Sequence, residues 1–213
     1  MKSTWMVLAA LALAGAPRGT CGAADLTGDE SVRVIRVSGR LLAGGKAAGE
    51  GATLQMNQRW ETPAGSESDI RVGSRAVLRL KPGTRMRMVR RKNGEIRISL
   101  EKGALLNAVR PGEKYRLETP VAAATIRGTV FFVENESAQT TYMCLCRGRM
   151  GVSASKNFTR ELTRAGHESI RVTTPAGKKS KAAPCEWHNH TDAEIAELTR
   201  HLEEAPLTQI RTP

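Results

Sequence analysis

The chain has 213 residues, of which 40% are hydrophobic, and this is enough apolar material for one domain with its own core. Its formal net charge of +12 favours anionic partners, but an aromatic content of 4% argues against a platform for stacking nucleic-acid bases. The sequence contains no complete phosphate loop, no nucleophile elbow and no evident Ser/His/Asp order. We therefore expect a protein that is not an enzyme and has no clear nucleic-acid partner.

The amino terminus has the features of a secretory signal peptide. Lys2 precedes an apolar run from Trp5 to Ala16, and small residues follow this run. The run is too short for a membrane span, which needs about 20 apolar residues. We predict cleavage after Ala23 or Ala24, which makes the mature chain periplasmic or secreted and leaves it without a transmembrane segment. Lipidation of Cys21 is the alternative, although the residues before it match a lipidation site poorly.

A series of short segments alternates apolar and polar residues, which predicts β-strands. Turn-forming pairs that contain Gly separate many of them and recur about every ten residues, a spacing typical of a sandwich or roll. We therefore predict an all-β fold of many short, mostly antiparallel strands. The predicted strands are 32–39, 68–73, 76–80, 86–89, 95–100, 114–118, 124–127, 130–133, 141–146 and 169–173. The predicted turns are Pro82-Gly83, Asn93-Gly94, Lys102-Gly103, Pro111-Gly112 and Arg147-Gly148.

One predicted strand carries a basic stripe. Arg85 and Arg87 alternate with Met86 and Met88, so a strand here buries the methionines on one face and exposes the arginines on the other. The exposed face would suit an acidic polymer, a phospholipid head group or a nucleic acid. The alternative is an ordinary solvated face of a basic protein.

The segment from Tyr115 to Val133 has the most distinctive pattern of the chain. Pro120 lacks a ladder donor and holds Thr119 extended, while Gly128 allows a bulge or a close backbone approach. We expect unusual backbone geometry at Gly128. A Thr-Pro pair that leads into an Arg-Gly-Thr-x-Phe strand resembles the signature of FecR-type extracytoplasmic domains. The signature residues here are Thr119, Pro120, Arg127, Gly128, Thr129 and Phe131.

The resemblance extends over about residues 55–175 and implies a domain organisation. We expect a signal peptide at 1–24, a FecR-like β-domain at 25–174, and a linker with a C-terminal helical appendage at 175–213. Full-length regulators of this type carry a cytoplasmic anti-sigma segment and a membrane helix before the periplasmic domain. Here the signal peptide leads directly into the β-domain. We therefore expect a free-standing binding or sensing module of the envelope, with an envelope protein or an anionic polymer as its partner.

The last third of the sequence holds the residues suited to a metal. Cys144 and Cys146 alternate on one predicted strand, so their thiols project from the same face as Tyr142. All four histidines and the three cysteines after Cys21 lie between residues 144 and 201. Thiolate and imidazole ligands suit zinc or another transition metal. We predict a metal site of Cys144, Cys146, His167 and His190, with Cys185 and His188 as alternates.

A subset of FecR-type chains is similar in this region. Those chains have a Cys-x-Cys pair after the Arg-Gly-Thr strand, a turn that carries histidine, and a His-Thr-Asp sequence that opens a last helix. The present chain has one histidine, His167, at the turn where the resemblance implies a pair.

Two other chemistries compete with the metal site. Because Cys144, Cys146 and Cys185 are odd in number, they cannot all pair within one exported chain. A disulfide from Cys185 to Cys144 or Cys146 would fasten the tail and leave one thiol buried. Alternatively, Cys144 and Cys146 would cycle as a dithiol in a thiol oxidoreductase, because their disulfide would form a strained and reducible ring.

The C-terminal region predicts a linker followed by one helix. Small and polar residues between Pro175 and Pro184 predict a flexible linker. Thr191 and Glu194 form a capping box, and Pro206 ends the helix. We expect its apolar face to pack on the β-domain and bring His190 toward it. That face consists of Ile195, Leu198 and Leu202, and His201 lies near its edge as a packing or exposed residue.

Overall fold

The computed structural model describes residues 31–154, 158–163 and 166–204. The predicted signal peptide, Cys21 and Pro206 lie outside these residues. The elements are β1 (Val32–Ser38), β2 (Leu41–Ala43), β3 (Lys46–Ala48), β4 (Thr53–Leu54), β5 (Arg59–Glu61), β6 (Glu67–Val72), β7 (Ala76–Leu80), β8 (Arg85–Arg90), β9 (Ile96–Val109), β10 (Tyr115–Glu118), β11 (Ala123–Ile126), β12 (Val130–Ser137), β13 (Thr140–Arg147), β14 (Met150–Ala154), β15 (Phe158–Leu162), β16 (Glu168–Thr173), β17 (Lys181–Pro184) and α1 (Asp192–Glu203).

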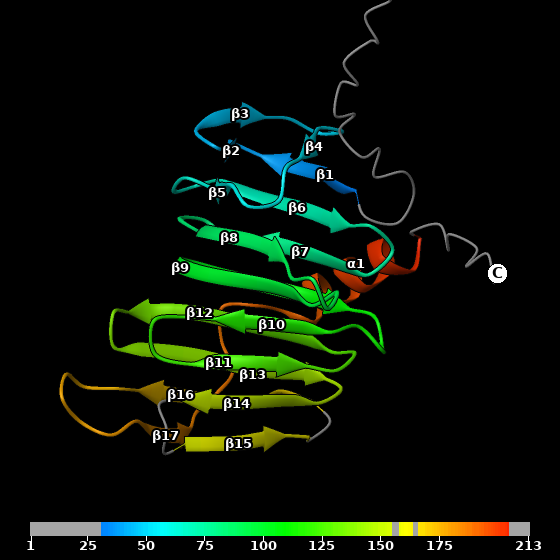
Figure 1. Cartoon of the computed structure of the whole chain (residues 1–213). Helices are drawn as coiled ribbons and strands as arrows, with labels where there is room; N and C mark the ends of the chain where they lie inside the picture. Colours follow the sequence, from blue (N-terminus) through cyan, green and yellow to red (C-terminus); the bar gives the residue numbers. More distant parts are fainter. Residues whose placement is uncertain (1–30, 155–157, 164–165, 205–213) are drawn as a thin grey trace, which may run out of the picture.

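The strands form two sheets that face each other and share β9. Sheet A has the order β4-β1-β6-β7-β9-β12-β13-β16-β17. Sheet B has the order β3-β2-β5-β8-β9-β10-β11-β14-β15. Figure 1 shows the strands stacked along the long axis, from the β2–β3 hairpin at one end to β15 and β17 at the other. The predicted all-β sandwich of mostly antiparallel strands with one C-terminal helix is confirmed; of the described pairings, β9–β10 is parallel.

Gly103 explains how β9 belongs to both sheets. The first half of β9 pairs with β8 and β10 in sheet B, and the second half pairs with β7 and β12 in sheet A. Gly103 has a φ of +80°, and a Cβ atom there would lie 2.6 Å from Thr84 Cα. Only glycine fits this corner. The predicted turn at Lys102-Gly103 is therefore wrong, because the residue bends one long strand instead of joining two.

The main core fills the space between the two sheets. Trp60 and Met88 of sheet B and Leu78 and Phe131 of sheet A are fully buried in it. Burial of each large apolar side chain contributes about 1.5–3 kcal/mol. The alternation predicted on β8 is confirmed, since its methionines are buried and Arg85 and Arg87 are exposed.

A second apolar layer covers the outer face of sheet A. Val77, Leu106 and Phe132 of the sheet pack there in one cluster with side chains of α1. The predicted helix and its capping box between Thr191 and Glu194 are confirmed. The buried face of α1 consists of Ile195, Leu198 and Leu202.

The structure differs from the sequence prediction in the linker. Residues 181–184, expected to be flexible, form β17 and pair with β16 at the edge of sheet A. Ser180 is buried, and its Oγ lies 2.8 Å from Thr174 Oγ1. An edge strand has unpaired backbone groups, so it can order a segment whose own composition does not predict a strand.

Candidate metal centre

The four side chains predicted as metal ligands lie together on the outer face of sheet A. Cys144 and Cys146 come from β13, His167 from the turn between β15 and β16, and His190 from the residue before the N-cap of α1. Their sulfur and ring nitrogen atoms all lie within 4.8 Å of one another. Cys144 is 0% exposed and His190 is 4% exposed. Three separate elements thus converge on one small volume.

The backbone of the turn holds His167 in an uncommon conformation. His167 has a φ of +47°, in the left-handed region that is uncommon for residues other than glycine, although asparagine, aspartate and histidine occupy it more often than the rest. Its Nδ1 lies 3.6 Å from Cys144 Sγ, and its Nε2 lies 2.9 Å from Asp192 Oδ1. The ring also stacks on Trp187 with centroids 4.1 Å apart. Strained backbone of this kind is often kept where a side chain has a functional position.

His190 is oriented from two sides. Its Nε2 lies 3.5 Å from Cys146 Sγ, and its Nδ1 lies 2.7 Å from the carbonyl oxygen of His188. The ring stacks on the buried ring of Phe132 with centroids 4.6 Å apart. These contacts fix both the position of the imidazole and the direction in which each nitrogen points.

The hydrogen bonds of the two histidines determine which nitrogen carries a proton. The carboxylate of Asp192 and the carbonyl of His188 can only accept, so His167 Nε2 and His190 Nδ1 donate. In the neutral imidazoles, the other nitrogen of each ring then presents a lone pair to the thiols. This is the tautomer that a metal-binding histidine needs, and an outer carboxylate or carbonyl commonly holds it.

The electrostatics of the two thiols are coupled. The hydrogen bond with Cys146 is the largest cause that lowers the pKa of Cys144, and His190, Ser169 and His167 add to it against the effect of burial. The same bond to Cys144, together with burial, raises the pKa of Cys146. Without a cation the pair therefore favours one thiolate and one thiol. Burial lowers the pKa of His167, but hydrogen bonds with Asp192 and Cys144 outweigh it and raise the pKa.

The two alternates lie apart from the four-residue cluster. The ring of His188 packs on Tyr142, and its Nε2 lies 3.6 Å from Glu136 Oε1. Cys185 is half-buried, and its backbone N–H donates to the carbonyl of Ser169. The three described cysteines are free thiols, so the alternative disulfide from Cys185 is not formed in this structure.

Asp69, Glu197 and His201 form a second group of ligand-type side chains. Its positive charge is supplied by a protein side chain, Arg79. The guanidinium of Arg79 donates two hydrogen bonds of 2.8 Å to Asp69 and one of 2.7 Å to Glu197. Burial raises the pKa of Asp69, but hydrogen bonds from Arg79 and Arg36 outweigh it and hold the pKa below its ordinary value. This group is an ion-pair network that joins α1 to sheet A.

Other basic side chains of the β-sandwich hold α1 along its length. Lys81 forms an ion pair with Glu194 in the first turn of the helix. At the other end, Arg71 donates to the carbonyl of His201 at 2.8 Å, and Arg110 donates to the carbonyl of Leu202 at 2.7 Å. The last carbonyls of a helix lack partners within it, so cations there are stabilising. The helix is thus fixed on sheet A independently of the candidate metal centre.

The Thr-Pro part of the signature closes a turn in the structure. Thr119 Oγ1 accepts a hydrogen bond from the backbone N–H of Ala122 at 3.1 Å, which closes the connection between β10 and β11. The same hydroxyl lies 2.8 Å from Thr141 Oγ1 on sheet A. Thr119 therefore links the turn to the opposite sheet.

The Arg-Gly-Thr part of the signature forms a corner between the sheets. Gly128 has a φ of +64°, and a Cβ atom there would lie 2.5 Å from Pro111 Cα, so the expected unusual backbone is confirmed. Thr129 Oγ1 donates to the carbonyl of Arg149 at 2.7 Å and joins this corner to the next one. Phe131 follows, fully buried in the main core.

The part of the sequence that contains this signature matches a known protein family. Residues 58–149 match the family model described as FecR protein. Residues 58–149 form a FecR-type domain. Cys144 and Cys146 lie inside the matched region, whereas His167 and His190 lie beyond it. The candidate centre therefore joins the FecR-type domain to the segment that follows it.

The fold of the chain is similar to that of solved structures. Two crystal structures of an inferred anti-sigma factor from Parabacteroides distasonis are similar to the chain, with TM-scores of 0.50 and 0.49. Each is 18% identical, and the similarity covers 59% of this chain and 59% of that chain. The likeness of the first shows the fold alone. No curated protein matches the chain. Within the part that the structure describes, no helix is long and apolar enough to cross a membrane.

Proposed function

We propose that the protein is a non-catalytic binding or sensing module of the cell envelope, and that a metal ion fastens its C-terminal helix to the FecR-type domain. The FecR-type domain and the sequence features of a signal peptide support the first part. One observation carries the second part: ligand atoms of Cys144, Cys146, His167 and His190 lie within 4.8 Å of one another.

The chemistry of the cluster supports zinc as the first candidate. Two thiolates and two neutral imidazoles form a common tetrahedral ligand set for zinc, with sulfur at about 2.3 Å and nitrogen at about 2.0–2.1 Å. A cation would release the proton that the coupled thiols hold between them. Asp192 and the carbonyl of His188 supply the outer hydrogen bonds that orient such histidines. With four protein ligands no position is open to a substrate, which supports a structural role.

Metal binding would link separate elements of the structure to one another. The ligands come from β13, from the turn before β16 and from the start of α1, so one ion would join a strand of the FecR-type domain to two segments that follow it. Binding free energy at a site that does not exist in the unfolded chain becomes folding free energy. Loading would therefore add stability to an appendage that ion pairs and hydrogen bonds already hold on sheet A, and the loaded surface would be the one presented to a partner in the envelope.

Elemental analysis of the mature protein, purified under reducing conditions without chelator, tests the proposal. We expect about one metal ion per chain, lost in Cys146→Ser and retained in Cys185→Ser, which removes a thiol outside the cluster. Cobalt substitution should give thiolate charge-transfer absorption in the wild type and in Cys185→Ser. A wild type that has reduced Cys144 and Cys146 but no metal, or an unchanged content in Cys146→Ser, would reject the metal centre.

The thiol oxidoreductase alternative stays a prediction from the sequence. It requires that Cys144 and Cys146 turn over as a disulfide and a dithiol. An insulin-reduction assay on metal-free protein, with Cys146→Ser as the inactive control and Cys185→Ser as the active one, addresses it directly.

A further inference from the structure

The outer face of sheet B carries a line of small side chains along two neighbouring strands. In the ladder between β11 and β14, Ala123 is opposite Ser153 and Thr125 is opposite Gly151. The residues between them point inward and are buried, as Ala124 shows. At about 3.3 Å per residue the two small pairs, which are two residues apart, extend for about 7 Å along the strands. We call this feature the β11–β14 furrow.

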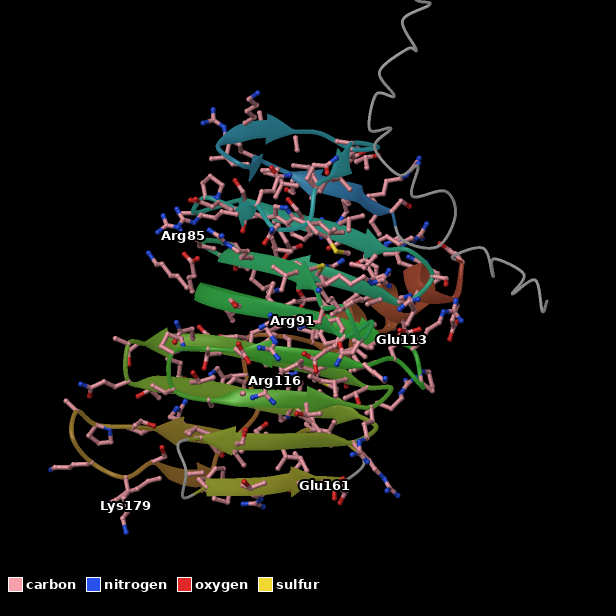
Figure 2. All side chains as sticks on the ribbon, viewed as in Figure 1. Arg85, Arg91, Glu113, Arg116, Glu161 and Lys179 are labelled. Atoms are coloured by element: carbon pink, nitrogen blue, oxygen red, sulfur yellow. The ribbon has the colours of Figure 1, made fainter. Side chains whose placement is uncertain are left out.

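Longer side chains border the furrow on both sides. Arg116 of β10 is opposite Thr125, and Glu161 of β15 is opposite Gly151. Figure 2 labels both on the side of the molecule that faces the viewer. Surface hollows of ≈ 280 Å³ and ≈ 340 Å³ lie at the two ends, the first lined by Thr125 and the second by Ser153. The furrow thus runs between two shallow hollows.

Unneutralised positive charge gathers at one end of the furrow. Arg127 follows the last residue of β11 and Arg149 precedes the first residue of β14, where Ile126 pairs with Met150, and both arginines line the ≈ 280 Å³ hollow. Both are exposed, and neither guanidinium has a carboxylate or hydrogen-bond partner among the described residues. Like charges near one another repel, so the arrangement favours an anion between them.

Other charges on the same face contrast with this pair. Arg116 is 2.8 Å from Glu118, and Arg85 on β8 is 3.3 Å from Glu61, so both are neutralised locally. At the ≈ 280 Å³ hollow, Arg160 approaches Glu168 at 3.4 Å and Glu161 is the one acidic lining residue. With Arg160 paired to Glu168, Arg127 and Arg149 face one carboxylate, Glu161, and leave this hollow positive.

The lining selects the kind of anion. Guanidinium groups bind carboxylate, sulfate or phosphate in a bidentate manner, and Thr125, Thr159 and Ser153 add hydroxyl groups. No aromatic side chain lines either hollow, so bases have nothing to stack on. The backbone of β11 and β14 is paired on both edges and cannot accept an added peptide strand.

We infer that the β11–β14 furrow binds an acidic polysaccharide, with Arg127 and Arg149 on its anionic groups and the hydroxyl-bearing floor against its sugars. This rests on the proposed role of the protein as a binding module, but not on the metal centre, because the furrow and the centre lie on outer faces of different sheets. An extended chain fits a strand pair with a hollow at each end, and its repeated hydroxyl groups suit the hydroxyl groups of Thr125, Thr159 and Ser153.

Fluorescence anisotropy with the full mature chain tests the inference. The probes are labelled polygalacturonate, dextran sulfate, neutral dextran and single-stranded DNA. We expect salt-sensitive binding of at least one acidic polysaccharide and none of neutral dextran. Arg127→Gln/Arg149→Gln should weaken binding at least tenfold. The matched control, Arg33→Gln/Arg40→Gln, removes the same charge from two exposed arginines whose side chains have no partner in the described residues, and should change binding less than twofold.

A second variant separates shape from charge. Ser153→Tyr places a large side chain on the floor of the furrow without changing its charge, so it should weaken binding. Because tyrosine is favoured in β-strands, the melting temperature should stay unchanged. Equal losses in the two arginine doubles, tighter binding of DNA, or no binding of either acidic polysaccharide overturn the inference. Metal content measured on the same samples keeps the two proposals apart. Polymer binding by a wild type that holds no metal rejects only the metal centre, and metal in a wild type that binds neither acidic polysaccharide rejects only the furrow.

Discussion

His167 Nε2 lies 2.9 Å from Asp192 Oδ1, and this contact links the turn before β16 to the first turn of α1. The carboxylate is itself largely exposed, whereas the ring is 16% exposed and faces the thiols on its other edge. Asp192 therefore orients an imidazole without entering the cluster of four ligand-type side chains. From the sequence alone, Asp192 can be recognised only as the first residue of a helix.

The contact predicts that Asp192→Ala weakens metal binding by about 10–100-fold, the usual effect of removing an outer partner of a ligating histidine. Asp192→Asn keeps an accepting oxygen and should retain most of the affinity. Chelator competition on the loaded protein measures both. Glu203→Ala, which removes an exposed carboxylate at the other end of α1, is the control. Equal affinities in Asp192→Ala and Glu203→Ala would contradict the role of Asp192.

A glycine at a corner of the sandwich gives a stability prediction. Gly128→Val should unfold the domain or lower its stability by at least about 1–3 kcal/mol, because the residue needs a positive φ and has no room for a Cβ. Gly112→Ala is the matched control, since Gly112 also has a positive φ but an added Cβ would meet nothing within 4 Å. Thermal melting of Gly128→Ala and Gly112→Ala should show a larger loss in the former. Identical midpoints would mean that the approach to Pro111 is not limiting.

Much of the candidate site could be predicted because its signals are local. The i, i+2 spacing places Cys144 and Cys146 on one face of a strand, and the capping box at Thr191 places His190 at the start of a helix. The contacts of Asp192 and Trp187 with His167 could not be predicted, because no periodicity connects a turn to a segment 20 or more residues later.

The parts of the fold that escaped prediction depend on tertiary partners. Lys102-Gly103 has the composition of a hairpin turn, yet Gly103 bends β9 because Thr84 packs against it. β17 forms because β16 offers a free edge. Arg79 binds Asp69 on the neighbouring strand and Glu197, which lies more than 100 positions later in the chain. In the sequence these residues are only scattered charges.

The amino terminus gives a prediction that stands on the sequence alone. We expect the mature protein to begin near Ala24 or Asp25, because a charged start, a short apolar run and small residues precede this point. Intact-mass spectrometry of protein recovered from its native host decides this. A retained Met1, or the added mass of lipid on Cys21, would reject it.

The carboxylates of the network that holds α1 predict acid sensitivity. Hydrogen bonds from Arg79 and Arg36 overcome burial and lower the pKa of Asp69, and the ion pair with Lys81 does the same for Glu194 against its own burial. A carboxyl whose folded pKa is lowered takes up its proton first in the unfolded chain as the pH falls. Its stabilisation is therefore complete above the ordinary carboxyl pKa of about 4 and is lost as the pH falls through the lower folded value.

Urea unfolding between pH 7 and pH 2.5 measures this loss. The series should be made in metal-free Cys146→Ser protein, so that protonation of metal ligands does not contribute. We expect stability to fall steadily below about pH 4, and Asp69→Asn to be less stable at pH 7 by up to about 3–5 kcal/mol, because it removes the buried charge partner of Arg79 and leaves the more exposed Glu197. Below pH 4 the curve of Asp69→Asn should be flatter than that of its parent. Parallel curves in this range would mean that Asp69 is not the group that titrates, and that other carboxylates cause the acid sensitivity.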